Sequence, residues 1–237
     1  MSNEMTIATE QPSYLVDFDQ ALAKGNEGIK VTQLATPRMK LLQIANDELK
    51  KSSEKYIEGA KPGEFVDVLN KKSYGNEVFA INITMRETWV IENLFGHGGG
   101  FFGTFETRQE AEDALPKVLE DNKDLKPANV DVWRHHEHLL YLADSDMNLS
   151  STPLLWDLKS SGIRPSNAWN TQIISQAGHR FSYIWKIKET EAKNAKGNTW
   201  ISFATELARG ETGNPLYTPE NLVESIKEML DSDAFSF

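Results

Sequence analysis

The sequence predicts a mixed β fold with peripheral helices, and three observations support this class. Large apolar side chains occupy alternate positions across residues 181–187, the period that places them on one face of a strand. A second alternation predicts a long, half-buried strand across residues 77–91. Residues 218–220 are Thr-Pro-Glu, which places a cap residue, a proline and an acid at the start of a predicted helix.

The other elements follow from the same kinds of pattern. Pro62-Gly63 is a turn signal ahead of a first strand. Thr107 and Glu110 form a capping box, so a helix is predicted to begin there, with an interruption or kink at Pro116. Residues 36–45 are expected to lead into a helical turn. Further strands are expected at 65–69, 101–105, 130–142 and within 152–162, and helices at 108–119 and 164–174.

A hairpin with a basic tip is predicted between residues 180 and 203. The turn pair Gly197-Asn198 separates its two aromatic, β-favouring segments. Residues 180–196 contain five Lys or Arg and two Glu, although the whole chain has a formal charge of −10. Aromatic rings beside cations are typical of surfaces that stack bases and follow the phosphates of a single strand. The alternative is that most of these rings fill the core of the sheet.

Composition limits the class of protein. The chain has 237 residues, enough for one large domain or one domain with appendages, and it contains no cysteine, which is typical of a reducing compartment. Residues 1–24 lack the pattern of a signal peptide, and no segment approaches the ~20 apolar residues of a membrane span. We therefore expect a cytoplasmic protein without a membrane partner.

Acidic residues concentrate at both ends of the chain. Residues 1–20 carry four acids and no Lys or Arg, and residues 220–233 carry five acids and one Lys. This distribution fits a basic groove flanked by acidic tails that compete with nucleic acid for it. The expected divisions are a flexible acidic arm at 1–30, a binding domain at 31–217, a helix at 218–230 and an acidic tail at 231–237.

Two motifs partly match cofactor-binding or metal-binding patterns, but neither match is complete. Gly98, Gly100 and Gly103 match the spacing of a dinucleotide fingerprint, but the segment after them is predicted to be a strand instead of the required helix. The histidines at 135, 136 and 138 would place only two imidazoles on one face of a strand, and zinc needs a further ligand. We expect no cofactor, no metal and no catalytic residue.

The aromatic hairpin with its Lys-rich tip, the Pro62-Gly63 turn and the acidic ending closed by Phe237 together resemble phage-encoded single-stranded DNA-binding proteins. The tail alone also resembles that of the bacterial proteins. This resemblance implies an OB-like five-stranded barrel core with insertions, followed by a C-terminal helix and tail. It also implies non-specific binding of single-stranded DNA in replication, recombination and repair. The tail would recruit replication enzymes such as DNA polymerase, helicase or primase, in the host cytoplasm.

The predicted contacts combine rings that stack on bases with cations that neutralise phosphates. For DNA they are Arg86, Trp89, Phe101, Lys159, Arg164, Arg180, Trp185, Lys186, Lys188, Lys193, Lys196 and Trp200. For protein partners they are Asp231, Asp233, Phe235 and Phe237. A homodimer is compatible with this hypothesis. The alternatives are a metal-dependent nuclease that uses the histidine cluster, and a non-catalytic adaptor or structural phage protein that binds other chains through its acidic ends and last helix.

Overall fold

The computed structural model describes residues 37–93, 100–143, 149–150 and 152–231. All of them lie in one unit of the chain, residues 36–237. The expected arm at 1–30 and three of the four tail residues, Asp233, Phe235 and Phe237, lie outside the described residues.

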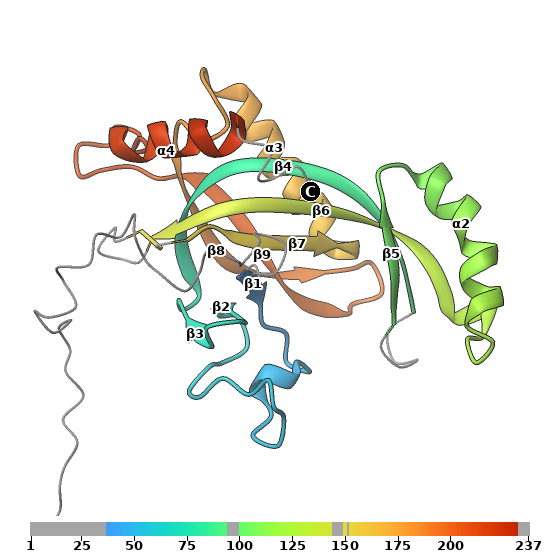
Figure 1. Cartoon of the computed structure of the whole chain (residues 1–237). Coiled ribbons are helices and arrows are strands. Elements are labelled where there is room, and N and C mark those ends of the chain that lie inside the picture. The colour runs from blue at the N-terminus through green and yellow to red at the C-terminus, as the bar shows by residue number, and fades with distance from the viewer. Residues whose placement is uncertain (1–36, 94–99, 144–148, 151, 232–237) are drawn as a thin grey trace, which may run out of the picture. The chain divides into compact units, whose positions relative to one another are not determined.

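The described residues form a sheet-dominated mixed fold in which one sheet contains nine strands (Figure 1). The strand order is β3-β2-β1-β7-β6-β4-β8-β9, with β5 paired to β4, and every pair is antiparallel except β1 with β7. The strands are β1 (Arg38–Leu41), β2 (Phe65–Asp67), β3 (Lys72–Ser73), β4 (Glu77–Asn93), β5 (Phe101–Phe105), β6 (Val130–Ala143), β7 (Leu154–Lys159), β8 (Ile184–Lys193) and β9 (Thr199–Leu207).

Strand β4 organises this sheet because of its length. One of its edges pairs with β6 along nearly the whole strand. The other edge pairs with β8 near the start of β4 and with β5 near its end. β4 and β6 arch across the unit, and the sheet curls into a half-barrel (Figure 1). The expected β-rich fold with peripheral helices is confirmed at this level, whereas an OB-like five-stranded barrel is not confirmed because the sheet has more strands.

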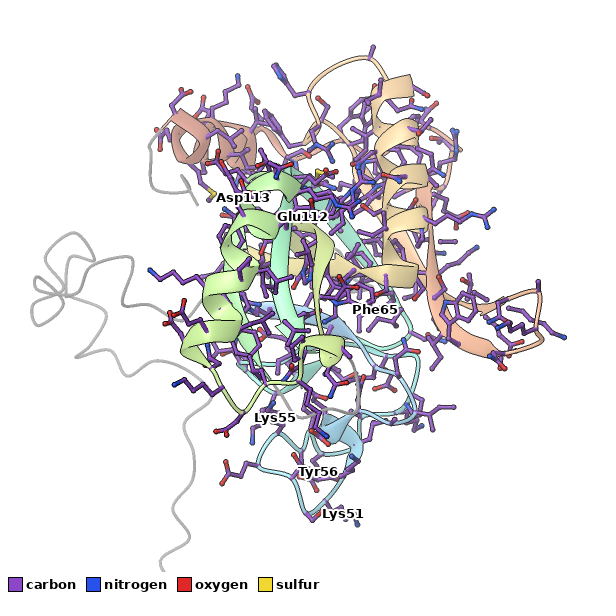
Figure 2. All side chains as sticks on the ribbon, turned by 90° about the vertical axis from the view of Figure 1, so that its right-hand side faces the viewer. Lys51, Lys55, Tyr56, Phe65, Glu112 and Asp113 are labelled. Carbon is purple, nitrogen blue, oxygen red and sulfur yellow. The ribbon has the colours of Figure 1, made fainter. Side chains whose placement is uncertain are left out.

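Three α-helices lie among the described residues: α2 (Arg108–Asp121), α3 (Ile163–Ser175) and α4 (Glu220–Asp231). The capping box predicted at the start of α2 is present, with Thr107 accepting from the Glu110 N–H and the Glu110 side chain accepting from the Thr107 N–H. The helix then runs through Pro116 without interruption. Its acidic side chains Glu112 and Asp113 are exposed (Figure 2). Three short 3-10 helices connect other elements: η3 (Asp47–Leu49), η4 (Pro127–Asn129) and η5 (Ser160–Gly162).

One strand was not predicted. Residues 36–45 were expected to lead into a helical turn, and within this segment residues 38–41 form strand β1, which pairs with β2 on one side and β7 on the other. Met39 is buried there in the main core, and Phe65 of β2 lies in the same cluster (Figure 2 labels Phe65). The expected helical turn follows as η3. Strand β1 itself depends on pairing with two segments that are distant in sequence, which the local pattern could not indicate.

The main core is rich in tryptophan. Trp156 of β7, Trp169 of α3 and Trp185 of β8 are all fully buried, and Phe203 of β9 contacts Trp156 with ring centroids 4.4 Å apart. The other face of the sheet has its own cluster, in which Ile226 of α4 is buried against residues of β4, β6 and β8. The sheet therefore has apolar residues on both faces, each with a helix packed against it.

A side-chain amide joins two parts of the sheet that are far apart in strand order. Gln43, just after β1, donates through Nε2 to the carbonyl oxygen of Ile201 in β9 at 2.9 Å. Its Oε1 accepts from the Ile201 N–H at 3.1 Å. The amide thus occupies the place that a neighbouring strand would take on the edge of β9. We call this junction between β1 and β9 the seam.

Candidate functional site

A charged pocket of about 550 Å³ lies on the face of the sheet away from the tryptophan core. Five strands contribute to it, and we call it the β4–β7 pocket. Arg86 of β4 pairs in register with Glu137 of β6, and Glu137 pairs with Asp157 of β7. Alternation along β4, β6 and β7 places residues of one parity from each strand on the pocket face. Its lining is Arg38, Arg86, Val90, Glu92, Phe101, Thr104, His135, Glu137, Leu155, Asp157 and Lys159.

His135 is a buried cation at the base of this pocket. Its Nδ1 lies 2.7 Å from the Asp157 Oδ1, and its Nε2 lies 3.8 Å from the Glu92 Oε1. Burial by itself lowers the pKa of His135, but interactions with Asp157 and Glu92 outweigh burial and raise that pKa to about 9. The imidazole is therefore protonated at neutral pH. Among the described residues, no acceptor lies within hydrogen-bond distance of its Nε2–H.

Glu92 is the complementary anion. Burial raises the pKa of Glu92, but its interactions with His135 and Lys159 outweigh burial, so the pKa is lowered. Lys159 forms an ion pair with Glu92, and Arg86 forms one with Glu137. These pairs hold the charged groups of the pocket in fixed positions on adjacent strands.

The pocket has a small excess of positive charge when His135 is protonated. Four basic side chains line it, against three carboxylates, in a chain whose formal net charge is −10. Phe101, at the start of β5, also lines the pocket, and 68% of its surface is exposed. An exposed ring beside paired cations can stack on a planar group while an anion exchanges with the carboxylates.

Three predicted contacts therefore come together: Arg86, Phe101 and Lys159 line one pocket. Trp89 does not join them, because it packs in the cluster under α2, with the Arg108 guanidinium 5.7 Å from the centre of its ring. Arg164 is exposed in the first turn of α3. Arg180 is half-buried and donates to Asn170, and burial lowers its pKa.

The predicted hairpin forms as β8 and β9, but it buries one of the two tryptophans that were expected to contact DNA. Trp185 is 1% exposed and contacts Trp169 edge-on, with ring centroids 6.4 Å apart, so it cannot stack on a base in this conformation. Its strand face is the core face of the sheet, which is the alternative that the sequence left open. Trp200 is half-buried, opposite Ala192.

The hairpin lysines divide into two groups. Lys186 lies 2.9 Å from a Glu77 oxygen, and Lys188 lies 3.5 Å from a Glu206 oxygen, so acids from neighbouring strands offset both charges. Lys193 and Lys196 are exposed near the turn.

Of the residues predicted to contact protein partners, Asp231 lies within the described part of the chain. It is exposed at the end of α4.

The other two histidines of the cluster belong to a buried network on the core side of β6. Asn82 Nδ2 lies 2.9 Å from His138 Nδ1, and Ser166 Oγ lies 2.8 Å from His138 Nε2 and 2.7 Å from His136 Nδ1. Burial lowers the pKa of His138 to about 3, and it also lowers that of His136, so both rings are neutral at pH 7.

Neutral rings fix the direction of each hydrogen bond in this network. The amide of Asn82 can only donate through Nδ2, so His138 Nδ1 accepts and its Nε2–H donates to Ser166. The Ser166 hydroxyl then donates to His136 Nδ1, and the His136 Nε2–H points toward Glu87, 3.4 Å away. Because Ser166 is fully buried, this network orders the core and does not form an accessible Ser-His site.

Alternation along β6 also separates His135 from His136 and His138, which lie on opposite faces of the sheet. In the part of the chain that the structure describes, no group of three or more His, Asp or Glu residues is arranged to hold a metal ion.

Sequence reasoning missed five charged members of the pocket: Arg38, Glu92, His135 as a pocket cation, Glu137 and Asp157. The spacing of Asp157 and Lys159 was a usable signal, because two residues apart on a strand they share a face. The pocket residues on the other strands, Arg38, Glu92 and His135, had no such signal, because their position beside β7 depends on how the strands pair.

The fold and the pocket together define a β-sheet protein with a charged pocket on the face of the sheet opposite the tryptophan core. The chain belongs to the family of Pam3 phage gp34-like proteins, whose model matches residues 3–229, and this membership indicates a bacteriophage protein. Neither a curated protein nor a solved structure matches the chain. None of the helices between residues 37 and 231 that the structure describes is long and apolar enough to cross a bilayer.

Proposed function

We propose that this protein binds single-stranded DNA without sequence specificity and without catalysis, and that the β4–β7 pocket is its main contact. The observation that carries the proposal is the position of Phe101, a largely exposed ring on a pocket that also holds Arg38, Arg86 and Lys159. Single-stranded DNA is recognised by this combination of a stacking ring and phosphate-binding cations.

Each group has a distinct part in the proposed complex. Phe101 stacks on one base, an interaction worth about 1–3 kcal/mol. Lys159 and Arg86 contact the adjoining phosphates by exchanging Glu92 and Glu137 for phosphate oxygens. His135 keeps a positive charge beneath them. None of these contacts depends on which base is present, because every base offers a flat face.

Further features extend the proposal beyond the pocket. Lys193 and Lys196, exposed on the β8–β9 hairpin, supply additional phosphate contacts. The curled sheet acts as an OB-like barrel whose seam is bridged by Gln43. In this hypothesis the protein protects single strands during phage replication, recombination and repair in the host cytoplasm. Its acidic ending recruits replication enzymes.

The test is fluorescence anisotropy with a labelled oligothymidylate at low salt. The native chain is expected to bind, and Phe101→Ala is expected to bind at least about fivefold more weakly, as for loss of one stacked base. Ile174→Ala is the matched control, since it removes another highly exposed apolar side chain, on α3. Absence of binding by the native chain, or equal losses in both variants, contradicts the proposal.

The same samples separate binding from a nuclease. Labelled DNA is incubated with the protein and Mg²⁺ and then resolved by length. Intact DNA is expected, and shortened products that depend on the protein would favour the enzyme instead.

A further inference from the structure

A second, smaller pocket opens at the seam between β1 and β9. It has a volume of about 280 Å³, and Asp157 and Lys159 line both this pocket and the β4–β7 pocket. The two pockets lie on opposite faces of the sheet and approach each other at the end of β7, where Lys159 is exposed. We call the smaller one the seam pocket.

The seam pocket combines an apolar floor with a polar rim. Trp156 and Phe203 contribute to the floor, but they are 1% and 5% exposed, so they provide apolar contact without offering a full ring face. Gln43, Asn46 and Ser161 lie around it. A flat, partly apolar group with polar edges suits such a lining.

The width of the seam is fixed by the chain itself. Both polar atoms of the Gln43 amide are bonded to the backbone of Ile201, which ties β9 to the segment after β1. Lys40 forms an ion pair with Glu48, a carboxylate that is only 2% exposed. These bonds make the seam pocket a preformed cavity instead of a gap between unconnected strands.

We propose that the seam pocket holds a second nucleotide of the same single strand, next to the one that stacks on Phe101. This inference rests on the proposed function. Lys159, shared by the two pockets, contacts the phosphate that links the two nucleotides. In this inference the strand runs from β5 around the end of β7, from one face of the sheet to the other, and reaches the seam. A volume near the lower limit of small-molecule sites, about 300 Å³, fits one base and not a longer stretch.

The variant Ser161→Phe tests the seam without disturbing the core. Ser161 is exposed in η5 and lines the seam pocket, so a phenyl ring there fills the cavity from the solvent side. Ser161→Ala is the control for loss of the hydroxyl. Lys40 is unsuitable, because its removal leaves the buried Glu48 charge unpaired and destabilises the fold.

The measurement is the affinity of each variant for oligothymidylates, from a dinucleotide up to about 16 nucleotides, the upper site size of an OB domain. For the native chain, affinity is expected to rise once the oligonucleotide reaches both pockets. Ser161→Phe is expected not to show this rise, so that its affinity for the longer oligonucleotides is at least about fivefold lower than that of the native chain. Ser161→Ala is expected to keep it, and thermal unfolding confirms that both variants are folded.

The outcomes separate this inference from the proposal beneath it. If Ser161→Phe matches the native chain at every length while Phe101→Ala weakens binding, the seam inference is overturned and the proposed function stands. If the native chain binds no oligothymidylate, both are overturned. A loss by Ser161→Ala equal to that of Ser161→Phe assigns the effect to the hydroxyl and also rejects a base in the seam.

Discussion

His135 Nδ1 lies 2.7 Å from Asp157 Oδ1, across the antiparallel pair of β6 and β7. This bond holds a protonated imidazole inside the protein, beneath a pocket in which Lys159 and Arg86 are also ion-paired. The pocket is therefore built from salt bridges in which each carboxylate stabilises a cation. That arrangement has consequences for stability and for binding that can be measured separately.

The first prediction concerns stability at alkaline pH. The folded pKa of His135, about 9, lies above its usual value of 6.5. The contribution of His135 to the free energy of unfolding is therefore complete below pH 6.5 and is lost as pH rises through about 9. The full contribution is at most about 3 kcal/mol. Asp157→Asn is expected to reduce this loss, since the main partner that raises the pKa is removed. Urea unfolding at pH 6.5 and pH 9.5 measures the difference, and Asp131→Asn, at an exposed acid of β6, is the control.

The second prediction concerns acid. Burial depresses the folded pKa of His138 to about 3, so the neutral ring contributes fully above pH 6.5 and the contribution is lost as pH falls toward 3. In His138→Gln this part of the acid dependence is expected to disappear. At pH 7 the variant is expected to be less stable by about 1–3 kcal/mol, because Asn82 and Ser166 lose their hydrogen bonds to the imidazole.

The measurement is the free energy of unfolding in urea at several pH values between 3 and 7. His179→Gln is the matched control, because His179 is exposed. A native-like pH dependence in His138→Gln would show that other groups, such as the paired carboxylates, cause the acid loss.

The alternation of side chains was enough to predict where most strands lie, but not which face of each strand is buried. Trp185 and Lys186 illustrate this: the period of two separates them, and the partner strands then decide that Trp185 enters the core. The same limit applies to the histidines, whose alternation predicts two faces without assigning either one. Face assignment depends on the order of the strands in the sheet and on which face α3 and α4 each cover, and neither is given by the pattern within one strand.

The candidate site shows a second limit. Arg86, Phe101 and Lys159 could each be chosen by residue type, but their proximity depends on the order of β4, β5, β6 and β7 in the sheet. Nothing in one sequence gives that order. Likewise, the acids Glu77 and Glu206 that offset the hairpin lysines come from neighbouring strands, so the local surplus of positive charge overstated the basic surface.

A third prediction concerns the seam. Gln43→Ala removes two hydrogen bonds to Ile201, so unfolding is expected to become easier by about 1–3 kcal/mol, since the backbone groups on β9 lose their partner. Hydrogen exchange at the Ile201 amide is expected to accelerate more than at the paired amides of β8 and β9. Gln109→Ala, on the exposed side of α2, is the control. Unchanged exchange at Ile201 would show that the amide bridge does not hold the seam.

The last prediction is the salt dependence of DNA binding. The logarithm of the association constant falls linearly with the logarithm of salt concentration, with a slope of about −0.7 for each phosphate contact on a single strand. Lys159→Ala is expected to make the slope shallower by about that amount, because one contact is lost. Lys117→Ala, at an exposed position of α2 outside the pocket, is expected to leave it unchanged. Equal slopes for the native chain and Lys159→Ala would mean that Lys159 stays paired with Glu92 in the complex and that the exchange of carboxylate for phosphate does not occur there.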